Sequence, residues 1–375
     1  MKITAVHTFP VTLPVRPEYF IASSAGTHAV SRYVVLAIET DDGTTGWGEA
    51  SVVPLWSGES QGGAIALIQD YFAPLLLHRS LDEVDLGELD RIAVDNHFTK
   101  AAVEMALWDL KGRHCGKPVY ELLGGARNPL QIPIKFSIGL RSPEEAAAIA
   151  AEKVRQGFTA IKIKVGPNPE EDLRRVAAVR EAIGPATKLN VDVNGGWSVD
   201  QAIREIPRYA PFHLEYVEQP TPRWDIDGLA RVRTAVNVPI MADETVFSVW
   251  QAEQVIAKKA ADLISIYPGK NGGLLKAQQI CRMAEEAGIR CHLGSNLEWD
   301  IGTAAMCHLA AACSNVPVTD FPVDILGHLY YAVHPKKNPV EFQNGRVLVP
   351  QGPGLGMDLD RDEIEALLKQ SHAAG

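Results

Sequence analysis

Cysteine is scarce in this sequence, and its spacing does not indicate a fold held by disulfides or zinc. Five cysteines occur among 375 residues, in neither a disulfide framework nor a zinc pattern. The N-terminus lacks the apolar core of a signal peptide, and no run of about 18 apolar residues is present. We therefore expect a cytoplasmic protein with reduced thiols. Cys115 and Cys291 are candidate nucleophiles, but the role of a buried structural thiol is favoured for each.

Positive charge is also in short supply. The chain holds 36 lysines and arginines against 46 aspartates and glutamates, which gives a net charge of −10. This acidic balance argues against nucleic acid and anionic membranes as partners. No low-complexity linker divides the chain, and its length allows one large domain or two with ample core. Function must therefore be sought in local patterns of residues.

Residues 1–128 are predicted to form an α+β capping domain. Tyr33–Thr40 and Gly46–Glu49 flank the stretch Asp41–Thr44, which is typical of a β-hairpin turn. Helical patterns then occupy residues 63–126. Together these patterns indicate a small sheet followed by helices.

Two long loops interrupt this first unit, near Arg16–Ala25 and Leu55–Gln61. Long loops in compact domains often carry function. Loops at the rim of a barrel can close over the active site and exclude water. Tyr19 and Trp56, one from each loop, are therefore candidate substrate-binding residues, and they suggest an apolar lid.

From Ile132 the pattern changes to alternating strand and helix, at about 25–29 residues per unit. Pro143–Gln156, Pro169–Ile183 and Gly273–Ala287 are clear helical segments. Eight such units predict an α/β fold of the (β/α)8 TIM-barrel type over residues 129–345. A doubly wound sheet is the alternative, but no glycine-rich dinucleotide turn follows the first strand. The strands are expected to begin near Ile132, Thr159, Leu189, Leu214, Pro239, Leu263, Ile289 and Val318.

The last stretch, residues 346–375, is expected to leave the barrel. Val349–Met357 is rich in glycine and proline, which favour turns, and a short polar helix follows. We expect this C-terminal segment to pack back on the capping domain.

Three carboxylates end apolar runs that have the length and β-branched content of buried strands. Asp192, Glu218 and Asp243 follow one another at intervals of about 25 residues, one strand–helix unit each. A carboxylate at the end of a buried strand is costly unless something pairs with it. Because the carboxyl ends of barrel strands meet at one rim, three hard oxygen ligands there would suit a divalent cation such as Mg²⁺. The alternative is that each acid caps the helix that follows.

Lys162 and Lys164 come one unit earlier, in the apolar run Phe158–Gly166. Residues i and i+2 of a strand face the same side. If that side is the barrel interior, two ammonium groups lie together beside the metal. Like charges and a cation both lower a lysine pKa, so one of the two amines could be neutral near pH 7 and act as a base. A solvated lysine face on an edge strand is the alternative, which the flanking apolar residues disfavour.

Several short motifs together resemble those of the enolase superfamily, and most closely its muconate lactonizing enzyme and mandelate racemase subgroups. The resemblance spans nearly the whole chain. Each motif alone is weak evidence, but their shared order and spacing make the resemblance specific. The motifs are Asp42-Gly43, Gly46–Ala50, Lys162-Ile163-Lys164, Ala242–Glu244, Gly272-Gly273, Gly352–Gly356 and the three carboxylates.

The resemblance implies one shared chemistry. A base removes the proton α to a carboxylate, while Mg²⁺ holds the carboxylate oxygens and stabilises the enediolate by electrostatic preorganisation. It implies a metal held by Asp192, Glu218 and Asp243. It further implies Lys164 as the base, with Lys162 as its partner.

The sequence departs from the family pattern where a second acid–base residue is expected. The muconate-lactonizing type has a lysine at the end of the sixth strand, where this chain has Tyr267. The mandelate-racemase type has a histidine at the end of the seventh strand, where this chain has Asn296. Tyr267 is a candidate catalytic acid, since a phenol beside a metal and lysines can have a lowered pKa; a packing role is the alternative. Lys270 lies nearby, and we expect a solvated turn residue there.

Other polar residues near strand ends are expected to contact the substrate. The candidates are Asn194, Asn296 and Glu298, with Asp320 and Asp324 near the eighth strand as weaker ones. His292 is expected to be a hydrogen-bonded core residue.

Lysines on one face only favour loss of a β-leaving group over proton transfer between two faces. We therefore expect a Mg²⁺-dependent lyase (dehydratase) or cycloisomerase acting on a small hydroxy or sugar acid. Two alternatives stay open. One is a racemase or epimerase in which Tyr267 or Lys270 serves the second face, and the other is a barrel that only binds carboxylates. The resemblance also implies a homo-oligomer, either a dimer or an octamer.

Overall fold

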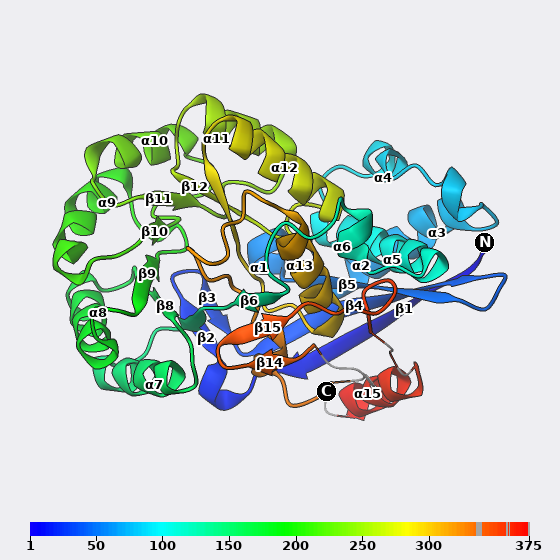
Figure 1. Cartoon of the computed structure of the whole chain (residues 1–375), viewed down its shortest axis with the longest axis horizontal. Helices are drawn as coiled ribbons and strands as arrows, with labels where there is room; N and C mark the ends of the chain where they lie inside the picture. The colour runs from blue at the N-terminus through cyan, green and yellow to red at the C-terminus, as the bar shows by residue number, and fades with distance from the viewer. Residues whose placement is uncertain (335–339, 358, 360, 374–375) are drawn as a thin grey trace.

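The computed structural model describes residues 1–334, 340–357, 359 and 361–373. It shows a ring of strands and helices beside a smaller N-terminal part (Figure 1). The first part holds a three-stranded antiparallel sheet in the order β1–β4–β5. Its strands are β1 (Ile3–Pro14), β4 (Val30–Thr40) and β5 (Thr45–Val52). The hairpin predicted from the Asp-Gly turn is confirmed, because β4 and β5 pair across that turn.

Helix α5 (His97–Cys115) packs across β5, and two glycines make this close approach possible. A Cβ atom on Gly48 would lie 1.8 Å from the carbonyl oxygen of Ala102, and one on Gly46 would lie 2.2 Å from that of Ala106. Any side chain at these positions would therefore push the helix off the sheet. The other helical segments of this part are α1 (Pro54–Ser57), α2 (Gln61–Leu67), η2 (Ile68–Phe72), α3 (Ala73–Leu76), η3 (Leu81–Glu83), α4 (Gly87–Ile92) and α6 (Val119–Leu122).

A second, smaller hairpin reaches from the N-terminal part to the barrel. Strands β2 (Ile21–Ser23) and β3 (Gly26–His28) follow the short 3₁₀ turn η1 (Pro17–Tyr19). The carbonyl oxygen of Ala22 accepts a bond from the backbone of a barrel loop at 2.7 Å, and Ser24 Oγ donates to another barrel carbonyl at 3.2 Å. Part of the segment expected as a loop is thus an ordered hairpin anchored on the barrel.

The second part is a curled parallel sheet of seven strands in the order β7 to β13. Each strand pairs with the next one along the chain, as short right-handed crossovers dictate. The predicted α/β barrel architecture is therefore present. The strands are β7 (Phe136–Ile138), β8 (Ala160–Lys164), β9 (Lys188–Asp192), β10 (Val217–Glu218), β11 (Ile240–Ala242), β12 (Leu263–Ile266) and β13 (Arg290–Leu293).

The eighth barrel position is not a regular strand, so the strand expected from Val318 is wrong. Val323 forms a single parallel bridge beside β7, and Asp324 N donates to the last carbonyl of β13 at 3.0 Å. Pro322 directly precedes this point, and proline has no N–H for a strand ladder. Val323 and Asp324 alone therefore complete the ring between β13 and β7.

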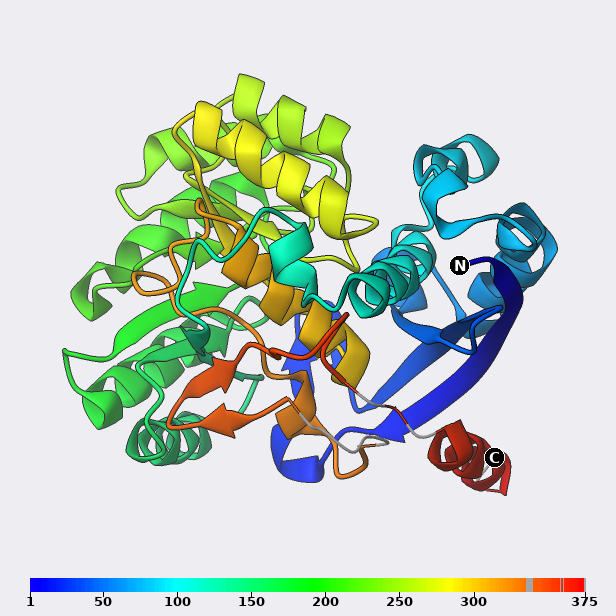
Figure 2. The same ribbon diagram turned by 45° about the vertical axis from the view of Figure 1, so that its right-hand side comes forward.

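Helices form the outer layer around these strands, as Figure 2 shows from a second side. Two of the expected helices begin at side-chain caps: Ser142 Oγ accepts from the backbone of Glu145, and Asn168 accepts from that of Glu171. Among the described residues, no helix is long and apolar enough to cross a membrane. The helices are α7 (Pro143–Arg155), α8 (Pro169–Ile183), α9 (Val199–Glu205), η4 (Ile206–Phe212), α10 (Ile226–Ala235), α11 (Val249–Ala257), α12 (Leu274–Glu286), α13 (Asp300–Ala312) and α14 (Gly327–Tyr330).

The C-terminal segment contacts both parts. Strand β15 (Arg346–Leu348) pairs with β14 (Phe342–Gln343) and with β6 (Gln131–Pro133), so the strand expected from Ile132 belongs to this small sheet and β7 begins the barrel. Helix α15 (Arg361–Ala373) then lies against β1. Leu355 N donates to the buried carboxylate of Asp109 on α5 at 2.8 Å. All five cysteines are free, and only Cys115 is exposed.

Candidate active site

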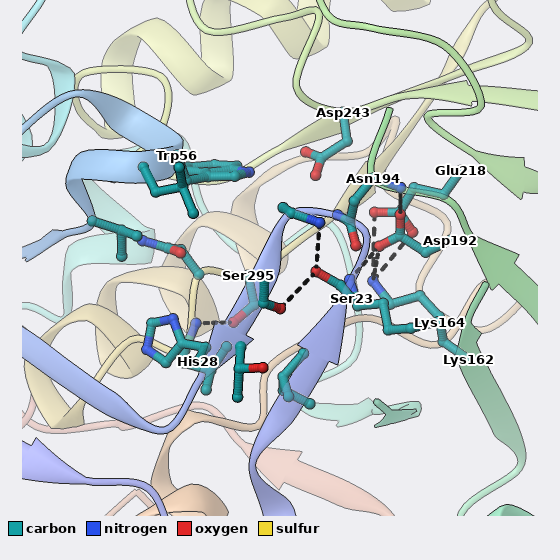
Figure 3. A pocket seen from close by; sticks show the side chains of 18 residues that line it. Ser23, His28, Trp56, Lys162, Lys164, Asp192, Asn194, Glu218, Asp243 and Ser295 are labelled. Carbon is teal, nitrogen blue, oxygen red and sulfur yellow. Dashed lines mark hydrogen bonds and ion pairs between the residues drawn. The ribbon is translucent and has the colours of Figure 1, made fainter. Parts of the chain in front are cut away.

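A cavity lies at the carboxyl ends of the barrel strands, where the N-terminal part covers them (Figure 3). It encloses about 120 Å³. Its barrel wall contains the two lysines of β8 and the three carboxylates that were singled out in the sequence. They are Lys162, Lys164, Asp192, Glu218 and Asp243. The structure therefore brings these five residues together, because parallel strands end at one rim.

Each of the three carboxylates is paired with a lysine. Lys164 Nζ lies 2.5 Å from Asp192 Oδ2, and Lys162 Nζ lies 3.2 Å from Glu218 Oε2. Lys270 Nζ lies 2.7 Å from Asp243 Oδ1. Buried carboxylates need such partners, and these three lysines supply them at this rim.

Lys270 corrects one of our expectations. It was expected to be a solvated turn residue, but its side chain is fully buried. Its ammonium donates to Asp243 Oδ1, to the Asp243 carbonyl at 2.8 Å and to the Ser265 carbonyl at 2.8 Å. The turn after β12 folds inward beneath the rim, and the lysine supports a carboxylate there. Its nitrogen is fully occupied by these three bonds.

Lys162 belongs to a deeper network that the sequence only partly indicated. Its Nζ lies 2.6 Å from Asp324 Oδ2, and the same oxygen lies 3.2 Å from Lys135 Nζ. Burial lowers the pKa of Lys162, but the surrounding carboxylates, with Asp324 first, outweigh burial and hold that pKa well above its usual value. Lys162 thus stays an ammonium, and it is not the neutral amine of the pair. Lys135 was missed, although one lysine inside the apolar run Ile132–Ile138 was a visible signal.

The oxygen atoms around the three carboxylates fit a hard cation in their chemistry. Asn194 Oδ1 and Glu244 Oε2 are buried and have no hydrogen-bond partner in the structure. Burial raises the pKa of Glu218 to about 7, and the neighbouring Asp192 adds to this shift. Unpaired oxygens and crowded acids are the environment that a divalent cation relieves. Among the described residues, however, no three acidic, histidine or cysteine side chains stand close enough to hold an ion as they lie, so binding one requires these side chains to shift together.

The position of Tyr267 and the direction of its pKa shift both differ from what the sequence suggested. It is fully buried and stacks on Trp56, with ring centroids 6.0 Å apart, and it is not among the residues that line the cavity. Burial, followed by nearby Asp243, raises its pKa well above the usual value, so the expected lowering is wrong in this structure. Its hydroxyl has no hydrogen-bond partner.

The turn after β13 contributes Ser295, Asn296 and Leu297 to the cavity wall. Asn296 lines the cavity, and its Nδ2 donates to the carbonyl of Ser51 in β5 at 2.9 Å. Glu298 lies behind it, where its carboxylate accepts from Ser295 Oγ at 2.6 Å and from Asn296 N at 3.0 Å. Glu298 therefore shapes the turn and does not line the cavity. His292 lies in the core as expected, fully buried, with Nε2 3.1 Å from the carbonyl of Pro322.

The N-terminal part supplies the opposite wall of the cavity. Trp56 lines it as expected, and its Nε1 lies 3.3 Å from Glu244 Oε1, which also accepts from Asn194 Nδ2 at 2.8 Å. Tyr19 does not line the cavity. It packs on Phe136 instead, with ring centroids 5.7 Å apart. The segment Arg16–Ala25, expected as a loop over the rim, contributes Ile21, Ser23 and Ala25 to this wall. Sequence reasoning missed that it forms the β2–β3 hairpin, which adds Gly26, Thr27 and His28.

Glu49, from the Gly46–Ala50 motif, is buried where β5 meets the barrel. Its carboxylate accepts from Trp299 N at 2.8 Å and from Gly302 N at 3.1 Å. Burial raises its pKa to about 8, although these two bonds act in the opposite direction. Folded protein therefore keeps a proton on Glu49 that unfolded protein has lost at neutral pH.

This raised pKa predicts a pH-dependent stability. The contribution of Glu49 is present below its usual pKa of 4.5 and is lost as pH rises through its folded value of about 8. Between pH 4.5 and about 8, each unit of rising pH is expected to lower the free energy of unfolding by about 1.4 kcal/mol through this group. Glu49→Gln, which does not titrate, is expected to flatten this fall in urea unfolding measured across the window. The exposed Glu144→Gln serves as control, and equal slopes for Glu49→Gln and wild type would contradict the prediction.

Fold and site together define the class: an α/β-barrel protein with a capping domain and a rim of lysines and carboxylates. Two family models match the chain, namely mandelate racemase / muconate lactonizing enzyme, N-terminal domain, over residues 3–124, and enolase C-terminal domain-like over residues 145–363. The chain belongs to the mandelate racemase/muconate lactonizing enzyme family of the enolase superfamily. The resemblance seen in the sequence is thereby confirmed.

Relatives within this family carry different activities. Muconate cycloisomerase 1 of Rhodococcus opacus is 34% identical over 372 residues, covering 97% of this chain and 98% of that protein. L-Ala-D/L-Glu epimerase of Bacillus subtilis is 34% identical over 362 residues, covering 95% and 97%. Among solved structures, the dipeptide epimerase of Enterococcus faecalis complexed with Mg and the dipeptide L-Leu-L-Tyr has a TM-score of 0.88 at 31% identity, covering 96% of this chain and all (100%) of that one.

Proposed function

We propose that this protein removes the proton α to the carboxylate of a small acid and acts as a lyase (dehydratase) or cycloisomerase. One observation carries the choice: the amines that line the cavity stand on one side of it. Lys162 and Lys164 lie on that side in Figure 3, and Trp56 lies across the cavity from them. Tyr267, at the place where a second acid–base residue would stand, is buried behind Trp56.

The proposed steps use the two lysines of β8. Lys164 Nζ, as the free amine, takes the α-proton, and the electron pair of the broken C–H bond forms the Cα=Cβ bond as the β-substituent leaves. The ammonium formed on Lys164 then gives its proton to the leaving group on the same face, which balances the step. Lys162 remains an ammonium and holds the substrate carboxylate by charge.

Asp192, Glu218 and Asp243 would hold a Mg²⁺ ion in this proposal. When bound, the cation supplies positive charge to the substrate carboxylate, which makes the α-proton more acidic. Support for Mg²⁺ comes from the chemistry of the oxygen ligands and from relatives whose structures contain Mg with a dipeptide. As in those relatives, the proposed partner is a small carboxylate.

An epimerase is the second candidate. The Tyr267 hydroxyl is buried without a hydrogen-bond partner. An unpaired buried donor costs free energy, and a catalytic role for this hydroxyl would explain why the cost is tolerated. Several relatives are named epimerases or racemases. Trp56 stacks on the phenol ring, which does not line the cavity, so this function would require Trp56 to move aside.

Proton NMR of a library of hydroxy, sugar and dipeptide acids in D₂O distinguishes these functions. With Mg²⁺, we expect loss of the α-proton signal together with an unsaturated or cyclised product. Removing the cation with a chelator is expected to abolish this change, and added Mg²⁺ is expected to restore it. Deuterium uptake with inversion at the α-carbon would instead support the epimerase. Full activity in the presence of the chelator would contradict the metal assignment.

A further inference from the structure

A chain of short hydrogen bonds runs from the cavity wall into the capping domain. His28 Nε2 lies 2.6 Å from Ser31 Oγ, and Ser31 Oγ lies 2.6 Å from the hydroxyl of Tyr331. That hydroxyl lies 2.5 Å from the hydroxyl of Tyr33, which donates to the carbonyl of Leu297 at 2.6 Å. Ser31, Tyr33 and Tyr331 are buried, while His28 lines the cavity at one end.

The number of protons available to these hydrogen bonds determines which ring nitrogen of His28 carries a proton. The four contacts of 2.5–2.6 Å each need one proton, and they take precedence over a fifth, longer contact of 3.0 Å between the Tyr331 hydroxyl and the same Leu297 carbonyl. The three hydroxyls of Ser31, Tyr33 and Tyr331 supply one proton each, and the terminal carbonyl of Leu297 supplies none. Both phenols keep their protons, because burial raises the pKa of Tyr33 and of Tyr331 above the usual value. The fourth proton must therefore come from His28 Nε2, which acts as a donor to Ser31.

This assignment leaves Nδ1 of His28 with a bare lone pair when the ring is neutral. Burial, followed by Arg32, lowers the pKa of His28 to about 4, so the ring is neutral at pH 7. In the described part of the chain, no residue forms a hydrogen bond with Nδ1. Nδ1 is also not one of the fully buried polar atoms that lack a partner. Because Nε2 points to Ser31, Nδ1 is the one polar atom of the ring that is left for a bound molecule.

We propose that His28 is a specificity-determining residue, whose Nδ1 accepts a hydrogen bond from an O–H or N–H group of the acid bound in the cavity. Figure 3 shows His28 across the cavity from Lys164. An acid held by its carboxylate near the lysines therefore presents its remaining groups toward His28. The inference rests on the proposed carboxylate site, and it adds that the preferred acid carries a hydrogen-bond donor away from the carboxylate.

Calorimetric binding of matched acids tests this inference without requiring turnover. The probes are butyrate, its 2-, 3- and 4-hydroxy derivatives and 3-aminobutyrate, all in Mg²⁺ buffer. Wild-type protein is expected to bind at least one donor-bearing acid about threefold to tenfold more tightly than butyrate, the value of one hydrogen bond. His28→Phe keeps a planar ring without an acceptor, and it is expected to bring this ratio to about one.

Two further variants separate recognition from folding. His28→Asn places an amide oxygen at the same number of bonds from Cα as Nδ1, so it is expected to retain part of the preference. His7→Asn, on β1 and away from the cavity, is the matched control and is expected to keep the wild-type ratio. A wild-type ratio of about one for every probe would overturn the inference. So would an undiminished preference in His28→Phe.

Failure of the inference and failure of the proposed function are distinguishable. A preference lost in His28→Phe, together with no α-proton exchange in D₂O, upholds the binding role and removes the proposed catalysis. Exchange of the α-proton without any preference for donor-bearing acids upholds the proposed catalysis and removes the binding role of His28. Absence of binding of all five acids by wild-type protein overturns both, since each requires a carboxylate in this cavity.

Discussion

Replacing Lys164 by alanine is expected to lower the rate of α-proton exchange by about 10²–10⁴-fold, the usual contribution of a general base. The reason is its position: its Nζ faces the cavity beside Asp192, whereas Lys162 is held as an ammonium by Asp324. Loss of the α-proton NMR signal in D₂O, followed over time with Mg²⁺ present, measures this rate. Lys164→Arg places a permanent positive charge beside Asp192 and cannot release its proton, so it is expected to be as inactive as the alanine variant.

The control for this experiment is Lys258→Ala, which removes a lysine from an exposed pair with Asp227. It is expected to exchange at the wild-type rate. An active Lys164→Arg would show that a fixed positive charge is sufficient at this position, and would remove the assignment of Lys164 as base. Binding of the substrate acid by both Lys164 variants shows whether the loss lies in the chemical step or in binding.

Lys270→Met is expected to lower the free energy of unfolding by about 3–5 kcal/mol, as when one partner of a buried ion pair is removed. The substitution keeps most of the side-chain volume but leaves the buried Asp243 carboxylate without its ammonium, together with two carbonyls. Urea unfolding in chelator-treated buffer measures the loss. The double variant Lys270→Met with Asp243→Asn is expected to recover part of it, because the uncompensated charge is gone.

Lys258→Met is the matched control for stability. Its side chain is 39% exposed and pairs with Asp227, whose side chain is 78% exposed, and exposed pairs contribute about 0–1 kcal/mol. A change of similar size in Lys270→Met would contradict the view that this lysine supports the rim. It would restore the expectation of a solvated turn residue.

The barrel and its rim could be predicted because their signals are local and periodic. Apolar runs that end in Asp192, Glu218 and Asp243 repeat once per strand–helix unit, and strand ends of a barrel share one rim. The same repeat predicts an eighth strand from Val318, which is wrong. Pro322 breaks the ladder there, so closure occurs at Val323 and Asp324.

Other features depend on contacts between distant segments, which no local pattern reveals. Lys270 was expected in solvent because a turn sequence is usually exposed, but its turn folds inward onto Asp243. The pKa of Tyr267 was expected to fall beside charges, yet desolvation beneath Trp56 dominates. His28 was overlooked, since its role depends on Ser31 and on tyrosines that lie up to 303 positions along the chain, as counted from 28 to 331.

The two walls of the cavity come from different parts of the protein, so they can change independently during evolution. The groups proposed to move the proton stand on strands of the barrel, where a shift in one strand disturbs its neighbours. The groups facing them stand on the β2–β3 hairpin and on the short helix α1. Under the proposed function, substitutions in these two short segments would change which acid is bound, while the lysines and carboxylates on the strands keep their positions.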